Sequence, residues 1–194
     1  MRKTIIFTAL VVIGSACFNC LISNSAYGLT VDGTISYASD PYSGESTGFK
    51  TTTGYGIGAS QYLTDSSESV QIAARVDINY YKWSNSSRYL EWSFARLPVF
   101  GGLRICWKAG PMQLYGEGGL ELSFDKRESF YTGPLYGILS PGQHNTYSDR
   151  SLGIIPGVGI EIPLFDNVLL GLNARYHLIN NPYTTVGLSV GYRF

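Results

Sequence analysis

Ten polar or charged residues of the chain fall at alternate positions within stretches that are otherwise apolar or small. Side chains with this spacing share one face of an extended β-strand. The ten residues are Asp32, Arg75, Asp77, Arg104, Glu117, Glu121, Glu161, Asn173, Arg175 and Arg193. Four of them are arginines and five are carboxylates. Buried charges must be paired, and arginine binds carboxylates in a bidentate geometry, so an ion-pair network is the chemistry that this set supports.

Two roles for this polar set are open from the sequence. The paired charges could fill the interior of a small barrel, because an eight-stranded barrel is just wide enough to be packed by side chains. Alternatively, small residues on the same face could leave a gated, narrow, porin-like passage. These small residues are Gly56, Gly58, Gly153, Gly157 and Gly159. Ion conductance distinguishes the two roles.

The sequence shows none of the patterns that a catalytic, cofactor or metal site requires. No metal-ligand spacing, glycine-rich phosphate loop or cysteine pair occurs after the N-terminal segment of residues 1–28, which holds Cys17 and Cys20, and His144 has no partner that the sequence identifies. We therefore predict that the protein is not an enzyme and has no catalytic, cofactor-binding or metal-binding residues. The net charge is zero, so we expect no interaction with nucleic acid.

Alternating apolar and polar residues predict eight β-strands that would position the polar set. The closing stretch VGLSVGYRF is a clear case, with apolar residues at 186, 188, 190, 192 and 194. The expected strands cover residues 29–38, 49–63, 69–82, 89–107, 112–124, 151–164, 168–178 and 186–194. The fourth changes phase along its length, and Pro98 suggests a bulge over residues 95–98 that would restore a single apolar face.

An N-terminal targeting segment indicates the compartment. Arg2 and Lys3 precede an apolar run over residues 5–18, which is too short to span a bilayer as a helix. Together with small residues at Ala26 and Gly28, it matches a secretory signal peptide. We expect residues 1–28 to be cleaved and residues 29–194 to form the mature domain. Cys106 is then the single remaining cysteine, and we expect it to be a buried filler.

The choice between a soluble sandwich and a membrane barrel follows from composition and connections. Charged residues make up only 14% of the chain, against roughly 25% in soluble domains. Connections are tight near residues 64–68, 108–111 and 165–167 and longer near residues 39–48 and 125–150, although those at 84–88 and 180–182 are short. Aromatic residues near predicted strand ends suggest two interfacial girdles. They are Tyr62, Tyr80, Trp83, Trp92, Trp107, Phe124, Tyr176 and Tyr192. We predict an all-β, eight-stranded, antiparallel, up-and-down transmembrane barrel.

The sequence resembles the outer-membrane-protein β-barrel-domain family, which includes small eight-stranded barrels and opacity-type surface antigens. The resemblance rests on the signal peptide, the stretches RLPVFGGLRI and QLYGEGGLELSF, and the closing GYRF. It implies an outer-membrane location in a Gram-negative bacterium. It also implies that the barrel-assembly machinery recognises the terminal strand through Tyr192 and Phe194. RYHLINNP also resembles outer-membrane lipid A deacylases, but their serine two residues after the catalytic histidine is replaced here by Ile179. His177 is therefore interpreted as an inward or interfacial polar residue.

The long connection over residues 125–150 is the candidate binding surface, because exposed loops on rigid scaffolds often carry function. Its candidate contact residues are Phe130, Tyr131, Tyr136 and His144. Folding over the barrel mouth as a lid is the alternative role. We predict a monomeric protein, embedded in outer-membrane lipid, with a structural or adhesin-like role and a surface or host partner. A narrow channel is the alternative function, and a lipid-modifying enzyme is the third.

Overall fold

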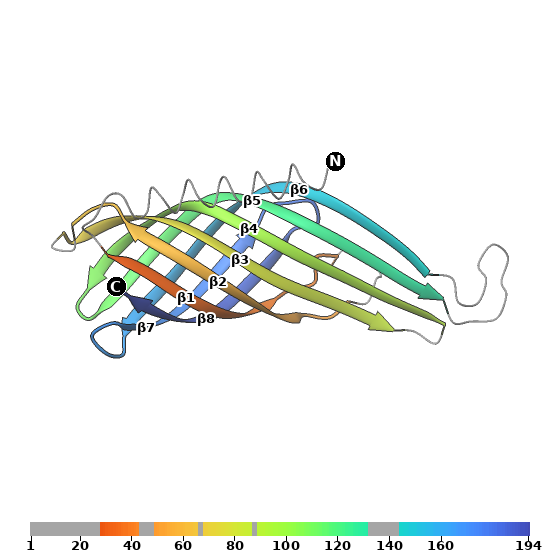
Figure 1. Cartoon of the computed structure of the whole chain (residues 1–194), viewed down its shortest axis with the longest axis horizontal. Coiled ribbons are helices and arrows are strands. Elements are labelled where there is room, and N and C mark those ends of the chain that lie inside the picture. The colour runs from red at the N-terminus through yellow and green to blue at the C-terminus, as the bar shows by residue number, and fades with distance from the viewer. Residues whose placement is uncertain (1–27, 43–48, 66–67, 87–88, 132–143) are drawn as a thin grey trace.

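The alternating segments of the sequence form a closed barrel (Figure 1). The computed structural model describes residues 28–42, 49–65, 68–86, 89–131 and 144–194. Its strands are β1 (Leu29–Ala38), β2 (Thr52–Tyr62), β3 (Val70–Ser86), β4 (Leu90–Ala109), β5 (Met112–Tyr131), β6 (His144–Pro163), β7 (Val168–His177) and β8 (Tyr183–Arg193). Each strand pairs antiparallel with its sequence neighbours, and β8 pairs with β1. The predicted eight-stranded antiparallel barrel is confirmed.

The two ends of the barrel differ. At one end, here called the turn end, Gly110 and Pro111 join β4 to β5, and residues 164–167 join β6 to β7. The positive φ of 64° at Gly110 suits glycine in such a turn. At the opposite end, here called the loop end, β3 to β6 continue beyond the other four strands (Figure 1). These four strands have 17 to 20 residues, whereas β1, β2, β7 and β8 have 10 or 11.

Apolar side chains point outward and polar side chains point inward over most of the barrel. On β3, Val76 and Ile78 are exposed, whereas Asp77 and Asn79, which alternate with them, are buried. The outward apolar side chains make an apolar belt, which ends toward the loop end at Tyr80, Leu97, Phe124 and Leu152 on the four long strands. Within the described ranges, no helix has the length and hydropathy needed to cross a membrane.

The expected bulge in β4 is wrong. The register of β4 with β3 is the same from Val70 opposite Trp107 to Ser86 opposite Glu91, and its register with β5 is equally continuous. The change of phase has another cause. Beyond the apolar belt the outward face of β4 becomes polar, and the inward face carries Phe94 instead.

The expected long connection over residues 125–150 is also wrong in extent. Residues 125–131 continue β5, and residues 144–150 begin β6, with Phe130 opposite His144. Residues 132–143, which include Tyr136, lie outside the described residues. Backbone pairing of the two strands explains the difference. Each added pair of residues extends the ladder of hydrogen bonds between the strands, and a loop would lack these bonds.

The predicted aromatic girdles are only partly outward-facing. Tyr80, Trp107, Phe124, Tyr176 and Tyr192 lie on the outward face of their strands. Tyr62 and Trp83, by contrast, are buried inside the barrel, and Trp92 lies opposite Asn85 on the inward register. Proximity to a strand end therefore did not distinguish interfacial aromatics from interior ones.

Candidate functional site

Glu117 lies at the centre of an ion-pair network inside the barrel. It accepts hydrogen bonds from Arg104, at 3.0 and 3.2 Å, and from Nε of Arg175 at 2.5 Å. Arg175 in turn donates to both carboxylate oxygens of Asp77, at 2.8 and 3.0 Å. All four residues are buried. Each charge is thus held by at least one oppositely charged group in a place that excludes bulk water.

A third arginine extends the network across the barrel. Arg75 donates two parallel hydrogen bonds to Asp32, at 2.8 and 2.9 Å, and a third from Nε to Asp77 at 3.1 Å. Arg104 also contacts Glu161, at 2.5 Å. Paired residues from six strands therefore tie opposite walls of the barrel together.

The glycines on the inward face do not leave a passage. A Cβ atom on Gly58 would lie 2.6 Å from Nη2 of Arg75, and one on Gly159 would lie 2.3 Å from the Tyr115 ring. Gly157 would approach Arg175 and Glu117 in the same way. These positions carry glycine because large side chains from neighbouring strands occupy the space that a Cβ atom would need. The cavity bordered by the network has a volume of about 10 Å³, which is no more than one water molecule needs.

The turn end of the interior is closed by a smaller group of side chains. Tyr62, Cys106 and Tyr115 pack there as a buried cluster. Arg193 donates to the hydroxyl of Tyr62 at 3.0 Å, and that hydroxyl donates to Gln113 at 3.1 Å. Cys106 is buried, as expected for a filler.

A histidine, a carboxylate and a hydroxyl stand in line above the network. Nδ1 of His177 lies 2.5 Å from Oε2 of Glu121, and Nε2 lies 3.1 Å from the hydroxyl of Thr185. A hydroxyl, an imidazole and a carboxylate in this order resemble a nucleophilic triad. All three are buried, and the His177 ring stacks on Tyr183 at 4.0 Å. Thr185 is 2% exposed and borders the cavity of about 10 Å³ described above, which holds no more than one water molecule.

Aromatic side chains cover the interior at the loop end. They are Tyr42, Tyr81, Trp83, Phe94 and Tyr183, here called the aromatic cap. Phe49 and Ile179, from two connections, pack against it. The cap follows from the change of phase on β3 and β4, where the inward face becomes apolar.

An arginine supports the aromatic cap from below. Arg96 pairs with both oxygens of Asp125, each at 2.8 Å, and donates to the backbone carbonyls of Asn180 and Asn181. Its guanidinium lies 5.1 Å from the Phe94 ring and 5.0 Å from the Tyr183 ring. The short β7–β8 connection is therefore fixed over the barrel mouth. Sequence reasoning missed this pair because Arg96 lay in the expected bulge and Asp125 in the expected loop.

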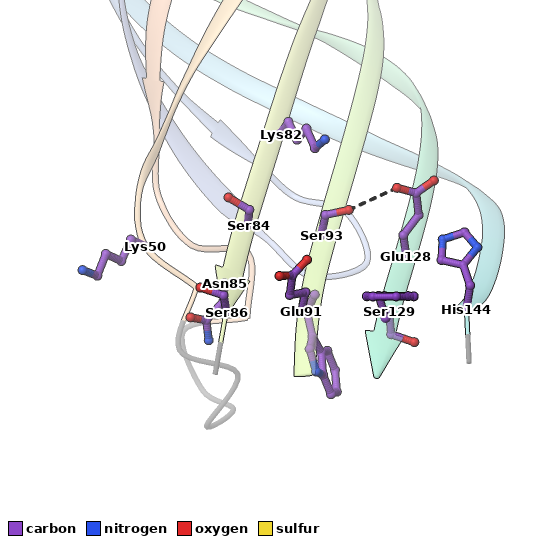
Figure 2. Close-up of a pocket in the computed structure, with 12 residues that line it drawn as sticks. Lys50, Lys82, Ser84, Asn85, Ser86, Glu91, Ser93, Glu128, Ser129 and His144 are labelled. Carbon is purple, nitrogen blue, oxygen red and sulfur yellow. Dashed lines mark hydrogen bonds between the residues drawn. The ribbon is translucent and has the colours of Figure 1, made fainter. Parts of the chain in front are cut away.

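The ends of β3 to β6 form an exposed surface beyond the apolar belt. We call residues 82–86, 90–96, 125–131 and 144–150 the sheet extension. A hollow of about 890 Å³ lies along it, with Lys82, Ser84, Ser93, Glu128 and His144 among its lining residues. Figure 2 shows these side chains distributed over neighbouring strands, with Ser93 donating to Glu128 at 3.3 Å. Lys126 also binds Glu128, at 2.5 Å, and this hydrogen bond lowers the pKa of the Glu128 carboxyl.

Comparison with known proteins identifies the family. The outer membrane protein beta-barrel domain matches residues 6–194 of the chain. The chain belongs to this family. Its location is therefore the outer membrane, as the sequence predicts. Barrels of this kind turn their short connections toward the periplasm and their longer ones outward, which is the orientation expected for the turn end and the sheet extension.

Solved structures agree with the fold. The attachment invasion locus protein Ail of Yersinia pestis is 14% identical, with 86% of this chain and 97% of Ail covered, at a TM-score of 0.53. OprG of Pseudomonas aeruginosa is 11% identical, with 88% and 97% covered, at a TM-score of 0.51. The outer membrane enzyme PagL is 11% identical, with 84% and 98% covered, at a TM-score of 0.47. A search of curated proteins gives no match. At these identities the likeness shows the barrel fold alone.

The structure separates the predicted site residues into two regions of this outer-membrane barrel. The ten residues of the polar set all lie on the inward face, nine of them buried and Arg193 half-buried. Of the candidate loop residues, Phe130 and Tyr131 end β5 and His144 begins β6. The Phe130 and His144 rings lie 6.4 Å apart. These three residues belong to the end of the sheet extension, away from the interior network.

Proposed function

We propose that this protein is a non-conducting, non-enzymatic outer-membrane barrel that contacts an extracellular partner through its sheet extension. The carrying observation is that four neighbouring strands continue past the apolar belt and end in an exposed polar hollow. A barrel that only spanned the membrane would need about 9–11 residues in each strand. The additional length of β3 to β6 therefore serves the space outside the membrane.

The filled interior supports this role over that of a channel. The network of Arg75, Arg104, Arg175 and their carboxylates occupies the middle of the barrel, and the aromatic cap lies over it. The sealed position of His177 and Thr185 likewise supports a non-enzymatic role. In planar bilayers we expect the folded protein to give no single-channel currents. Reproducible currents from protein with the folded gel mobility would contradict the non-conducting part of the proposal.

Removal of the end of the sheet extension tests the surface role. Residues 128–146 would be replaced with a short Gly-Ser turn, which removes Glu128, Phe130 and His144 but leaves the apolar belt complete. Adherence of bacteria displaying the protein to cultured epithelial cells and to one another would be measured. We expect adherence to fall to the level of bacteria without the protein, while the barrel keeps its heat-modifiable gel mobility.

A matched control alters the opposite end of the barrel. Replacing residues 164–167 of the β6–β7 turn with a Gly-Ser turn changes a periplasmic connection, and adherence should remain. Equal adherence of the parent and the shortened protein, or none by the parent over bacteria that lack it, would overturn the proposed surface role.

We also propose that Tyr192 and Phe194 mark the last strand for the barrel-assembly machinery. Phe194 is exposed, its amide donates to the carbonyl of Leu29 at 2.8 Å, and its ring lies 4.9 Å from that of Tyr192. A Phe194→Ala variant should fold normally into lipid vesicles but accumulate less in the outer membrane of cells. An equal loss in both settings would mean that Phe194 acts through stability alone.

Cleavage after Gly28 and a monomeric state belong to the same proposal. The first strand begins at Leu29, and pairing of β8 with β1 closes the sheet around the barrel wall, so no open edge for another copy remains there. Mass spectrometry of the extracted protein should give Leu29 as its N-terminal residue. Light scattering of the detergent-solubilised protein should give the mass of one chain, and a dimer mass would contradict the monomer.

A further inference from the structure

Cations occupy one level on the outward face of the long strands. On β3, β5 and β6, the next outward residue beyond the last apolar one is positively charged: Lys82 follows Tyr80, Lys126 follows Phe124, and Arg150 precedes Leu152. On β4 the corresponding residue is Ala95, beside Leu97. All three cations are exposed.

The strand register brings these cations together. Ala95 pairs with Lys82 on one side and with Lys126 on the other. Arg150 pairs with Phe124, two residues before Lys126, and its guanidinium lies 5.7 Å from the Phe124 ring. Lys82, Lys126 and Arg150 thus form a cationic row over four neighbouring strands. On other strands, β2, which pairs with β3, and β8 carry the hydroxyl residues Thr53 and Thr184 at their loop ends instead.

We propose that the cationic row binds the phosphate groups of an anionic glycolipid in the outer leaflet of the membrane. The row directly borders the apolar belt, so a lipid whose acyl chains lie against Tyr80, Leu97 and Phe124 would present its head group at this level. Lysine and arginine reach from apolar surface to charged head groups in this way. The inference is independent of the proposed surface partner.

The nearby carboxylates do not neutralise the row. Glu128 pairs with Lys126, but the two side chains are 32% and 55% solvent-exposed, and such exposed pairs contribute little. Glu91 lies four residues from Ala95, toward the end of the sheet extension. Glu128 and Glu91 therefore stand farther from the apolar belt than the cations. Asp149 is level with Arg150 but shares the inward register of its partner Asp125, so a phosphate on the outward face would be nearer to the cations.

The test is a titration of fluorescent diphosphoryl lipid A into the folded protein in maltoside micelles, followed by anisotropy. The variant Lys82→Gln/Lys126→Gln removes two charges of the row. Each cation near an anionic head group contributes about fivefold in affinity, so the dissociation constant should rise roughly 25-fold. The control Lys108→Gln, matched to Arg150→Gln, removes an exposed lysine at the turn end of the barrel and should change the dissociation constant less than about twofold. The single variant Arg150→Gln, with about a fivefold rise expected, provides a second test should the double variant not fold.

Two further binding measurements identify the source of the phosphate. Lipid A without phosphates should bind the parent protein as weakly as diphosphoryl lipid A binds the double variant, and millimolar inorganic phosphate should displace little lipid. An unchanged dissociation constant in both row variants would overturn the proposal, as would an equal rise in the control. Full displacement by inorganic phosphate would show a general anion site instead of a lipid site.

Discussion

Replacing Arg175 with methionine should lower the free energy of unfolding by about 3–5 kcal/mol, the usual cost of leaving a buried charge without its partner. Arg175 is buried and binds both Asp77 and Glu117. Methionine keeps much of the side-chain volume but offers neither carboxylate a positive charge. The measurement is guanidinium unfolding of the protein in phosphatidylcholine vesicles, followed by tryptophan fluorescence and by gel mobility.

Arg150→Met is the matched control for this prediction. Arg150 lies on the exposed face of β6, with its guanidinium 5.7 Å from the ring of Phe124. The same substitution there should change the free energy of unfolding by less than about 1 kcal/mol, as for other exposed charges. Equal effects of the two variants would show that the interior network is hydrated, and the description of a filled interior would then be wrong.

Strand alternation made most of the barrel predictable from the sequence. The predicted bounds of the first strand, residues 29–38, agree with β1, because one face had to meet lipid and the other a polar interior. The same alternation placed Arg75, Glu117 and Arg175 on one face. It could not say which arginine binds which carboxylate, because pairs such as Arg75–Asp32 and Arg175–Asp77 join strands that do not follow one another in sequence.

The loop end was harder to predict because the rule that works in the membrane reverses there. Outside the membrane the outward face meets water, so Ser84 and Ser93 replace apolar residues. The inward face meets other connections, so Trp83 and Phe94 replace charged ones. A change of phase within one continuous strand thus marks the place where the strand leaves the bilayer. In β4 the same signal was misread as a bulge.

The inward glycines illustrate a second limit of the sequence. Gly58 and Gly159 suggested free space, since each lacks a side chain. The space is instead taken by Arg75 and by Tyr115, which reach across from neighbouring strands. Alternation of small and large residues across a pair of strands is a packing pattern, and only the register shows which large residue lies over which glycine.

The second large loss of stability is expected from a substitution in the aromatic cap. Trp83 is buried, stacks on Phe94 at 5.4 Å, meets Tyr183 edge-on at 5.8 Å, and donates its indole N–H to the carbonyl of Ser39 at 3.1 Å. Trp83→Ala would leave a cavity at the barrel mouth and an unbonded carbonyl in the β1–β2 connection. We expect the free energy of unfolding to fall by about 3–5 kcal/mol.

The location of this loss is as informative as its size. Hydrogen exchange should speed up at Ser39 and Tyr42, which depend on the cap, and remain slow at Arg75, which the charged network holds. Trp92→Ala is the control, because Trp92 is 45% exposed and its removal should cost less than about 1 kcal/mol. If Trp83→Ala also costs less than 1 kcal/mol, the cap contributes little to the fold. The barrel mouth would then be closed by its connections and not by aromatic packing, and the interior would be open to solvent whenever those connections move.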